Sequence, residues 1–303
     1  MKIAVVGLGR MGRALARRFL TQGIDVVVWN RSAGPLRQLV AAGALAADDQ
    51  ADVWNETTAV CTFLADDAAA RNVLVGERSL VARAPSHCLL IELSTISPTA
   101  SSEIAQTAEE SGVRYLRAPV SGNPDVLMAG NLSLIVSGDE ADFQAARPIM
   151  SRIGSSARYV GIGETARVLK LAVNAMLAGT AQLLSEAVVL TEAFGMDRST
   201  VLEVLQNSAV GSPFLRYKET TLLNRDYAAT FTLSMLLKDL RLVQRLADLE
   251  NVPLPICDLV AQLTKGGCDE GFGELDLLAL LPHLQRAAHR PVDVDSNRNS
   301  RAD

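Results

Sequence analysis

Val6-Gly7-Leu8-Gly9-Arg10-Met11-Gly12 follows a short apolar run near the start of the chain. That run, Lys2–Val6, reads as a strand, and residues 14–22 have the apolar spacing of a helix that stops at Gly23. A second apolar run at residues 25–29 reads as another strand. The order strand, GxGxxG, helix, strand is typical of a unit that binds a dinucleotide.

Each glycine of the motif has its own physical task. Gly7 allows a tight turn, Gly9 lets the backbone approach a pyrophosphate, and Gly12 lets helix and strand pack closely. The start of the helix adds N–H groups and a dipole that favour phosphate. The alternative is an ordinary strand-to-helix turn that binds nothing. The residues expected to bind the cofactor here are Gly7, Leu8, Gly9, Arg10, Met11 and Gly12.

The end of the second strand indicates which nicotinamide cofactor binds. An NAD site usually has an acidic residue there, which accepts hydrogen bonds from the ribose. This strand ends in Trp29-Asn30-Arg31-Ser32, without an acid. Asn30 and Ser32 can donate to a phosphate, and Arg31 can stack on adenine and pair with a 2′-phosphate. We predict NADP as the cofactor, with NADPH preferred over NADH; the alternative is a turn with an incidental arginine.

Strands and helices alternate up to about residue 162, which predicts a mostly parallel sheet. Ligands of such sheets bind at the carboxyl ends of the strands, so the loops 7–12, 64–66 and 94–95 should face the cofactor. Asp67 is expected to cap the helix over 68–75, and Ser97 with Pro98 should open the helix that runs to Gly112. The other expected strands are 59–64, 89–93, 114–116, 132–137 and 157–160, and the other helices are 36–42 and 141–153.

After residue 163 only helical patterns follow, at 164–194, 198–207, 213–223, 232–250, 255–266 and 274–288. The predicted fold is α/β, with an N-terminal dinucleotide-binding Rossmann domain over 1–162. An all-helical domain for substrate binding and dimerisation follows over 163–290. Residues 291–303 are polar and aperiodic, which predicts a disordered tail.

The helix over 164–194 is apolar on most sides, yet it carries Lys170 and Asn174 four residues apart. This spacing places both side chains on one face. A lysine on a buried helix is rare unless it is paired or functional, so the alternative is a lysine at a solvent-exposed edge. The apolar circumference is more than the later helices can cover, which predicts a homodimer or homotetramer.

Composition excludes several classes of protein. The net charge is −5 and there is no long basic run, so a nucleic-acid partner is not expected. Four dispersed cysteines indicate buried thiols in a reducing, cytoplasmic location, and the N-terminus lacks a signal-peptide pattern. The most apolar segment contains charged residues, so we expect no membrane span, and no cluster of ligand residues predicts a metal.

With these landmarks placed, the chain resembles the β-hydroxyacid dehydrogenase family over roughly residues 1–287. Four motifs occur in the family's order, and a fifth near the chain end is similar to the family's closing motif. They are Val6–Gly12, Ala118-Pro119-Val120-Ser121-Gly122, Gly163 with Lys170 and Asn174, Lys238-Asp239-Leu240, and Gly271-Phe272-Gly273-Glu274-Leu275-Asp276.

The resemblance implies a role for each matching residue. Lys170 would be the general acid/base, and Asn174 would orient the lysine or the substrate. Ser121, Gly122 and the N–H of Asn123 would hold the carboxylate of a small substrate. Leu64, Ala65 and Thr95 would line the nicotinamide ribose, and Phe231 and Lys238 would close over the cofactor. Asp239 is as readily structural, holding the lysine or a helix end.

The chemistry agrees with these roles. Hydride transfer from the nicotinamide C4 to a carbonyl carbon builds negative charge on oxygen, which an ammonium group stabilises and then protonates. In the reverse direction a neutral lysine accepts the alcohol proton, and burial makes that state accessible. The resemblance therefore implies an NADPH-dependent enzyme that interconverts a small semialdehyde or 2-oxo acid and its hydroxy acid.

Two departures and two alternatives remain. The family usually has a second glycine where this chain has Asn123-Pro124, and paired glycines where it has Ser137-Gly138. Asn123 could donate to the substrate carboxylate or narrow the pocket.

The same architecture also occurs in imine reductases, which resemble this chain less at Lys170 and at the substrate motif. A non-catalytic cofactor-binding module is the other alternative, against which an intact Lys170 argues.

Overall fold

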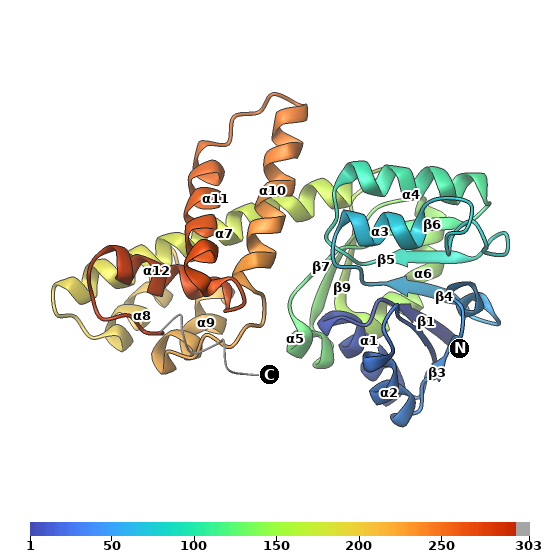
Figure 1. The fold of residues 1–303 in the computed structure, drawn as a ribbon, viewed down its shortest axis with the longest axis horizontal. Coiled ribbons are helices and arrows are strands. Elements are labelled where there is room, and N and C mark those ends of the chain that lie inside the picture. Colours follow the sequence, from blue (N-terminus) through green and yellow to red (C-terminus); the bar gives the residue numbers. More distant parts are fainter. Residues whose placement is uncertain (295–303) are drawn as a thin grey trace. The chain divides into compact units, whose positions relative to one another are not determined.

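The structure is a computed structural model, and it describes residues 1–294. The chain divides into two compact units, Met1–Leu171 and Ala172–Asp303. The helix α7 (Thr165–Ala193) runs through the division (Figure 1). The sequence predicted the domain boundary between residues 162 and 163, before this helix. In the structure the two compact units meet between Leu171 and Ala172, about two turns after the start of α7. Lys170 therefore belongs to the first unit and Asn174 to the second.

A six-stranded sheet organises the first unit, in the order β3-β2-β1-β4-β5-β6. Every neighbouring pair in it is parallel, as predicted. Chain order reverses between β1 and β4, and dinucleotides bind at such a reversal, outside the carboxyl ends of the strands. The strands are β1 Lys2–Val6, β2 Asp25–Trp29, β3 Leu45–Ala46, β4 Ala59–Thr62, β5 Leu89–Glu92 and β6 Arg114–Arg117.

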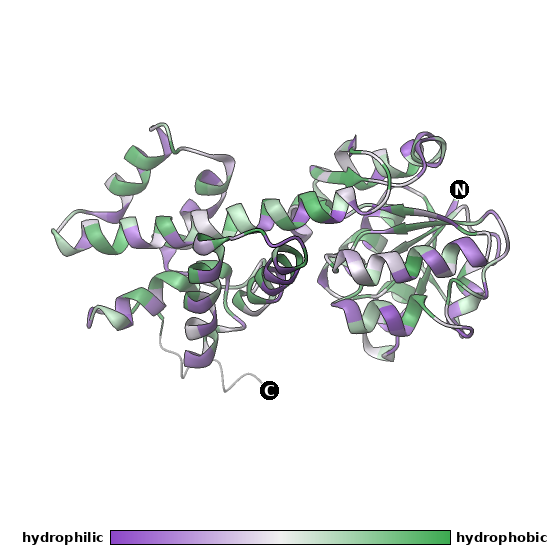
Figure 2. Cartoon of the chain, turned by 90° about the horizontal axis from the view of Figure 1, so that it is seen from above, coloured by the Kyte–Doolittle hydropathy of each residue, from purple (hydrophilic) through white to green (hydrophobic). Residues whose placement is uncertain are grey.

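Alternate side chains of the sheet enter two separate cores. Ile3 and Val5 of β1 pack in one core, whereas Ala4 and Val6 pack in the other. Helices on both faces explain why the central strands read as continuous apolar runs (Figure 2). The first core includes α1 (Arg10–Thr21), α2 (Ala33–Ala41) and α6 (Glu140–Ile153). The second includes the short helix η1 (Gln50–Trp54), α3 (Asp67–Leu74) and α4 (Pro98–Glu110).

A second, three-stranded sheet was not foreseen as a separate sheet. It consists of β7 (Val120–Ser121), β8 (Leu132–Val136) and β9 (Gly154–Tyr159), with an antiparallel and then a parallel pairing. The short helix α5 (Pro124–Met128) connects β7 to β8. Two residues of strand and five of helix are too short for apolar periodicity to reveal.

Helix caps follow the sequence, with one correction. Ser97 accepts a hydrogen bond from Ala100 N and opens α4 with Pro98 at its first position, as predicted. The cap of α3 is Asp66, not Asp67, because the Asp66 carboxylate accepts from Ala69 N. Asp67 instead accepts from Ser97 N, so it ties the starts of α3 and α4 together.

The described part of the second unit is built from helices around one core. The helix predicted over 274–288 is shorter in the structure, where α12 covers Leu280–Ala287 and the short helical segment η3 covers Leu277–Ala279. Asp293 accepts from Arg198 and from the Tyr227 hydroxyl, and Val292 and Val294 pack against the core. The prediction of a disordered tail from residue 291 is therefore wrong for residues 292–294. Residues 295–303 lie outside the described part of the chain. The helices are α8 Arg198–Gln206, α9 Pro213–Asn224, α10 Leu233–Leu249, α11 Pro255–Gly267, η2 Cys268–Phe272, η3 Leu277–Ala279 and α12 Leu280–Ala287.

One helix in the described chain, α7, is long and apolar enough by length and composition to cross a membrane. The charged residues of this segment led to the prediction of no membrane span, which a test of length and composition does not decide. The core helix of a globular protein passes the same test.

Candidate functional site

The glycine-rich loop after β1 has the geometry that its sequence predicts. Gly7 has φ +85°, and a Cβ there would lie 2.2 Å from the Phe63 carbonyl oxygen. A Cβ on Gly12 would lie 1.9 Å from the Gly7 carbonyl oxygen, so helix and loop touch at that point. A Cβ on Gly9 would meet nothing within 4 Å. Protein packing therefore requires Gly7 and Gly12, whereas Gly9 leaves open the approach to the start of α1.

Asn30, at the end of β2, holds this loop from the side. Its Oδ1 accepts from Leu8 N at 2.9 Å, and its Nδ2 donates to the Ser32 hydroxyl at 2.9 Å. The amide expected to donate to a phosphate is thus engaged within the protein. Arg31 and Ser32 are both exposed. Arg31 therefore remains available to a phosphate, as does the O–H of Ser32, because the Ser32 hydroxyl only accepts from Asn30.

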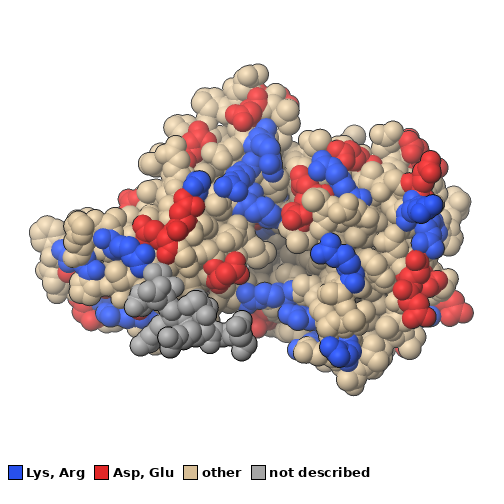
Figure 3. All heavy atoms as spheres, viewed as in Figure 1, with Lys and Arg blue, Asp and Glu red and all other residues tan. Residues whose placement is uncertain are grey.

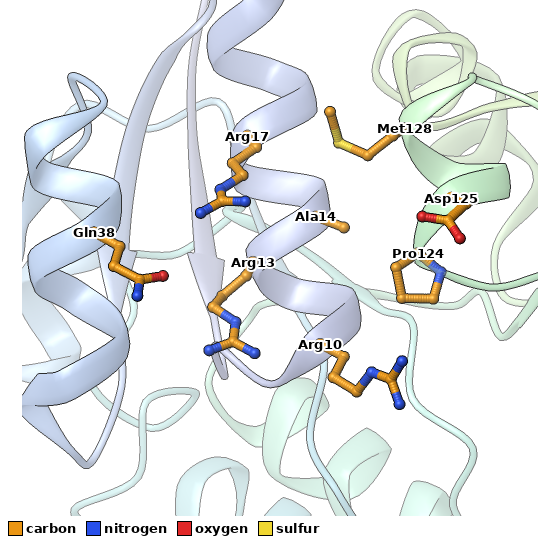
Figure 4. A pocket seen from close by; sticks show the side chains of 8 residues that line it. All are labelled: Arg10, Arg13, Ala14, Arg17, Gln38, Pro124, Asp125 and Met128. Atoms are coloured by element: carbon orange, nitrogen blue, oxygen red, sulfur yellow. The ribbon is translucent and has the colours of Figure 1, made fainter. Parts of the chain in front are cut away.

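A basic hollow of about 370 Å³ lies on the outer face of α1. Three of its lining residues are arginines of α1, and Arg10 belongs to the glycine-rich motif (Figure 4). The hollow does not include Lys170 or the substrate motif, so it is not the predicted reaction centre. The lining consists of Arg10, Arg13, Ala14, Arg17, Gln38, Pro124, Asp125 and Met128.

The two other predicted cofactor loops are hydrogen-bonded to each other. Leu64 N donates to the Ser94 hydroxyl at 2.7 Å, and Ser94 N donates to the Glu92 carboxylate at 3.0 Å. Thr95, next in the chain, is half-buried, whereas Ala65 is exposed. The structure therefore brings these loops together at the carboxyl ends of β4 and β5, as predicted.

The substrate motif ends in a turn that only glycine fits. Gly122 has φ +135°, and a Cβ there would lie 2.5 Å from Leu132 Cδ2. Ser121 is half-buried just before it. Asn123 is buried and caps α5, since its Oδ1 accepts from Asp125 N and Val126 N at 2.9 and 3.0 Å. The Asn–Pro pair is the sequence signal of a cap and first helical position.

Lys170 is buried in α7, with 8% of its surface exposed. This excludes the alternative of a lysine at a solvent-exposed edge. The start of α7 is fixed by Ser137, whose hydroxyl donates to Gly163 O at 2.6 Å and accepts from Ala166 N at 3.3 Å. A glycine at position 137 could make neither bond, so this departure from the family pattern positions the helix that carries Lys170.

In the second unit, Asp239 holds two of the predicted residues. Asn174 donates from Nδ2 to Asp239 Oδ2 at 2.6 Å, and Lys238 Nζ lies 2.9 Å from Asp239 Oδ1. Asp239 is 2% exposed. Of the two structural roles considered for this aspartate, holding the lysine is the one observed. Phe231 is partly buried against the core of the same unit.

Among the buried charged groups that the sequence did not reveal, one lies beside Lys170. Arg167, in the first turn of α7, is 1% exposed and forms an ion pair with Glu92, which is fully buried. Arg167 and Glu92 are both charged residues inside apolar segments, and this pattern could have indicated a buried ion pair. The neighbouring motifs, Lys170 for Arg167 and Ser94-Thr95 for Glu92, gave the stronger signal.

Other features of the described residues bear on the function classes. Within residues 1–294, no group of three or more His, Cys, Asp and Glu side chains could hold a metal ion. On the face drawn in Figure 3, basic and acidic side chains are interspersed. The four cysteines are unpaired thiols, and burial raises the pKa of Cys61 to about 12.

Two family models together match most of the chain. Residues 2–161 match the NAD-binding domain of 6-phosphogluconate dehydrogenase. Residues 164–284 match the NAD-binding domain of NADP-dependent 3-hydroxyisobutyrate dehydrogenase. The first match alone spans more than half of the chain.

Full-length relatives agree with these matches. An uncharacterised oxidoreductase, YfjR, of Bacillus subtilis is 33% identical over 93% of this chain and 99% of its own length. Glyoxylate/succinic semialdehyde reductase 1 of Arabidopsis thaliana is 28% identical over 93% and 97%. The structure of 3-hydroxyisobutyrate dehydrogenase of Mycobacterium tuberculosis with L-serine has a TM-score of 0.85 at 25% identity, over 94% and 99%. The chain is therefore an NAD(P)-binding oxidoreductase of the β-hydroxyacid dehydrogenase family.

Proposed function

We propose that this protein is an NADPH-dependent reductase of a small semialdehyde or 2-oxo acid, with Lys170 as the general acid. The observation that carries the proposal is the burial of Lys170 in a chain that otherwise has the family's cofactor and substrate motifs. A buried ammonium group is costly unless it is used or paired, so burial on the helix with the family's catalytic motif supports a part in the chemistry. The reverse oxidation would use the same lysine as a base.

The proposed reaction moves one hydride and one proton. The cofactor, when bound, supplies the hydride to the carbonyl carbon of the substrate. Lys170 stabilises the negative charge that develops on the carbonyl oxygen and donates the proton to it. Asn174 lies one helical turn after Lys170, and its amide is oriented by Asp239, so it is suited to hold the lysine or the substrate oxygen.

The substrate carboxylate is assigned to the turn after β7. The Ser121 hydroxyl and the backbone N–H groups at Gly122 and Asn123 are donors of the kind that a carboxylate prefers. Because Asn123 uses its side-chain oxygen to cap α5, its Nδ2 is held in a fixed direction. We assign Asn123 to the lining of the substrate pocket, where it selects among small acids.

The preference for NADPH rests on the end of β2. Residues 29–32 carry no acid that would repel a 2′-phosphate, and Arg31 is exposed beside Asn30. Asn30 holds both the Leu8 N–H and Ser32, so its role is to shape the turn. Arg10, in the glycine-rich loop, adds a second positive charge near the phosphates. Phe231 and Lys238 are assigned to the cofactor as the family motif implies.

We also propose that the protein is a homodimer or homotetramer that pairs through α7. Met176, Leu183 and Leu190 recur every seven residues and are 76%, 64% and 61% exposed. Gly179 lies between the first two and has open space around it. A seven-residue apolar repeat is the pattern by which a helix packs on a second copy of itself. The four thiols support a reducing, cytoplasmic location for this assembly.

One assay tests the reaction against its alternatives. Purified protein with NADPH is offered glyoxylate, succinic semialdehyde, methylmalonate semialdehyde and a cyclic imine, and NADPH absorbance is followed. The proposal expects turnover of at least one of the three acids and faster turnover with NADPH than with NADH. Turnover of the imine alone would make the protein an imine reductase. NADPH binding with no turnover of any compound would indicate a non-catalytic cofactor-binding module.

A further inference from the structure

Arg167 is the largest of the fully buried side chains in the described part of the chain. It lies in the first unit, three residues before Lys170 on α7, so the two side chains leave adjacent turns on the same side of the helix. An arginine in this position must satisfy five N–H donors without water. The partners that satisfy them show what the residue connects.

The guanidinium group contacts three elements other than its own helix. Nη2 donates to the Glu92 carboxylate at the end of β5 and to the Tyr115 hydroxyl in β6 at 3.2 Å. Nη1 donates to the Ser94 carbonyl oxygen at 2.6 Å, and Nε donates to the Ser101 hydroxyl in α4 at 3.2 Å. Arg167 therefore joins the start of α7 directly to the loop that follows β5.

Glu92 and Ser94 extend this connection to the second cofactor loop. The other Glu92 oxygen accepts from Ser94 N at 3.0 Å and from the Thr62 hydroxyl at 3.3 Å. The Ser94 hydroxyl accepts from Leu64 N at 2.7 Å. A continuous set of hydrogen bonds therefore runs from the turn before Lys170 to both loops assigned to the nicotinamide ribose.

Stability alone does not explain a buried ion pair here. Desolvation offsets much of the attraction between buried charges, and well-packed apolar side chains often serve folding equally well. A planar guanidinium with several fixed donors does what apolar side chains cannot, because it sets the distance and angle between the groups it bonds. The position of Arg167 between Lys170 and the cofactor loops points to this use.

We infer that Arg167 is a positioning residue that, through Glu92 and Ser94, aligns Lys170 with the loops holding the nicotinamide ribose. The inference rests on the proposed function of Lys170. Reaction rates depend steeply on such alignment, since a displacement of about 1 Å can cost roughly 100-fold in rate. Arg167 does not itself touch the reacting atoms.

The test separates alignment from folding with three variants. Arg167→Lys keeps the positive charge but loses the planar fork, and we expect kcat to fall by about 10–100-fold. The double variant Arg167→Met with Glu92→Gln removes both charges while keeping an amide oxygen for Ser94 N. It should recover thermal stability relative to Arg167→Met alone, yet kcat should stay low. Recovery of kcat together with the melting temperature would show that Arg167 is merely structural.

Arg198 provides the matched control. It is a buried arginine in the second unit, and its partners Glu192, Asp293 and the Leu222 carbonyl oxygen all lie outside the cofactor loops. Arg198→Lys should lower the melting temperature without lowering kcat more than about two-fold at a temperature where the protein is folded. An equal fall of kcat in the Arg198 and Arg167 variants would overturn the inference.

Amide hydrogen exchange gives a readout that needs no substrate. In Arg167→Lys, exchange at the Leu64 and Ser94 amides should accelerate at least about ten-fold, and in Arg198→Lys it should not change. Unchanged exchange at both amides in Arg167→Lys would contradict the inference whatever the activity. If Lys170→Ala keeps full activity, the proposed function fails. If Lys170→Ala loses activity but Arg167→Lys keeps it, only this inference fails.

Discussion

The side-chain oxygen of Asn30 accepts a hydrogen bond from the backbone N–H of Leu8 at 2.9 Å. The end of β2 and the glycine-rich loop are therefore held together by a residue whose sequence position suggested a phosphate donor. Asn30 is therefore engaged within the protein, and the proposed contact with a 2′-phosphate falls to Arg31, which sets the first prediction.

Arg31→Asp should weaken NADPH binding by ~1.5–3 kcal/mol, because it replaces a charge-assisted contact with repulsion. NADH binding should change much less. Measurement of kcat/KM with both cofactors tests this, with Arg37→Asp on α2 as a control of equal charge change. A wild-type enzyme that favours NADH, or equal losses in both variants, would refute the role of Arg31.

Gly9→Ala and Gly12→Ala should have different consequences. A Cβ at position 12 meets the Gly7 carbonyl oxygen at 1.9 Å, so Gly12→Ala should destabilise the fold by roughly 1–3 kcal/mol or more. A Cβ at position 9 meets no protein atom, so Gly9→Ala should cost less than ~1 kcal/mol yet weaken NADPH binding at least about tenfold. Thermal melting and NADPH titration check both. Unimpaired binding by Gly9→Ala would place the pyrophosphate elsewhere.

Much of this architecture follows from sequence because apolar runs, glycines and helix caps act locally. The parallel sheet, Ser97 with Pro98, and the long α7 are of this kind. The role of Asn30 is not of this kind. Its side chain could either bind a ligand or hold backbone, and the contact with Leu8, 22 residues earlier in the chain, decides between the two.

The buried Arg167–Glu92 pair shows a second limit. The residues are 75 positions apart, and nothing local in either segment indicates its partner. The short β7 and α5 escaped prediction for a different reason, because their hydrogen bonds and Asn123 cap stabilise them without an apolar period.

Two substitutions of Asn123 can separate its observed role as the cap of α5 from its proposed role in substrate selection. Asn123→Gly should cost only a few tenths of a kcal/mol in stability. It should nevertheless change selectivity across semialdehydes of increasing chain length by ~1–3 kcal/mol. Asn123→Asp keeps the cap but replaces the amide by a carboxylate, so it should lower kcat/KM for every acid substrate. Parallel kcat/KM profiles for wild type and both variants would show that the side chain only caps α5.

The proposed pairing through α7 predicts that Leu183→Glu yields monomers, because it places a charge in the exposed apolar row formed by Met176, Leu183 and Leu190. Val204→Glu on α8 is the control, since Val204 is 62% exposed and Leu183 is 64% exposed. Light scattering at low micromolar concentration gives the mass of each variant. A monomeric and active wild-type protein, or dissociation by both substitutions, would contradict pairing through this row.

The most direct test of the account is the kcat of Lys170→Ala with the best acid substrate. The account predicts a loss of roughly 10²–10⁴-fold, the usual share of a general acid, with NADPH binding nearly unchanged. Lys170→Met, which keeps most of the side-chain volume, should lose as much, and added methylamine should restore part of the activity of Lys170→Ala. A wild-type kcat in Lys170→Ala would show that the buried lysine has no part in the chemistry.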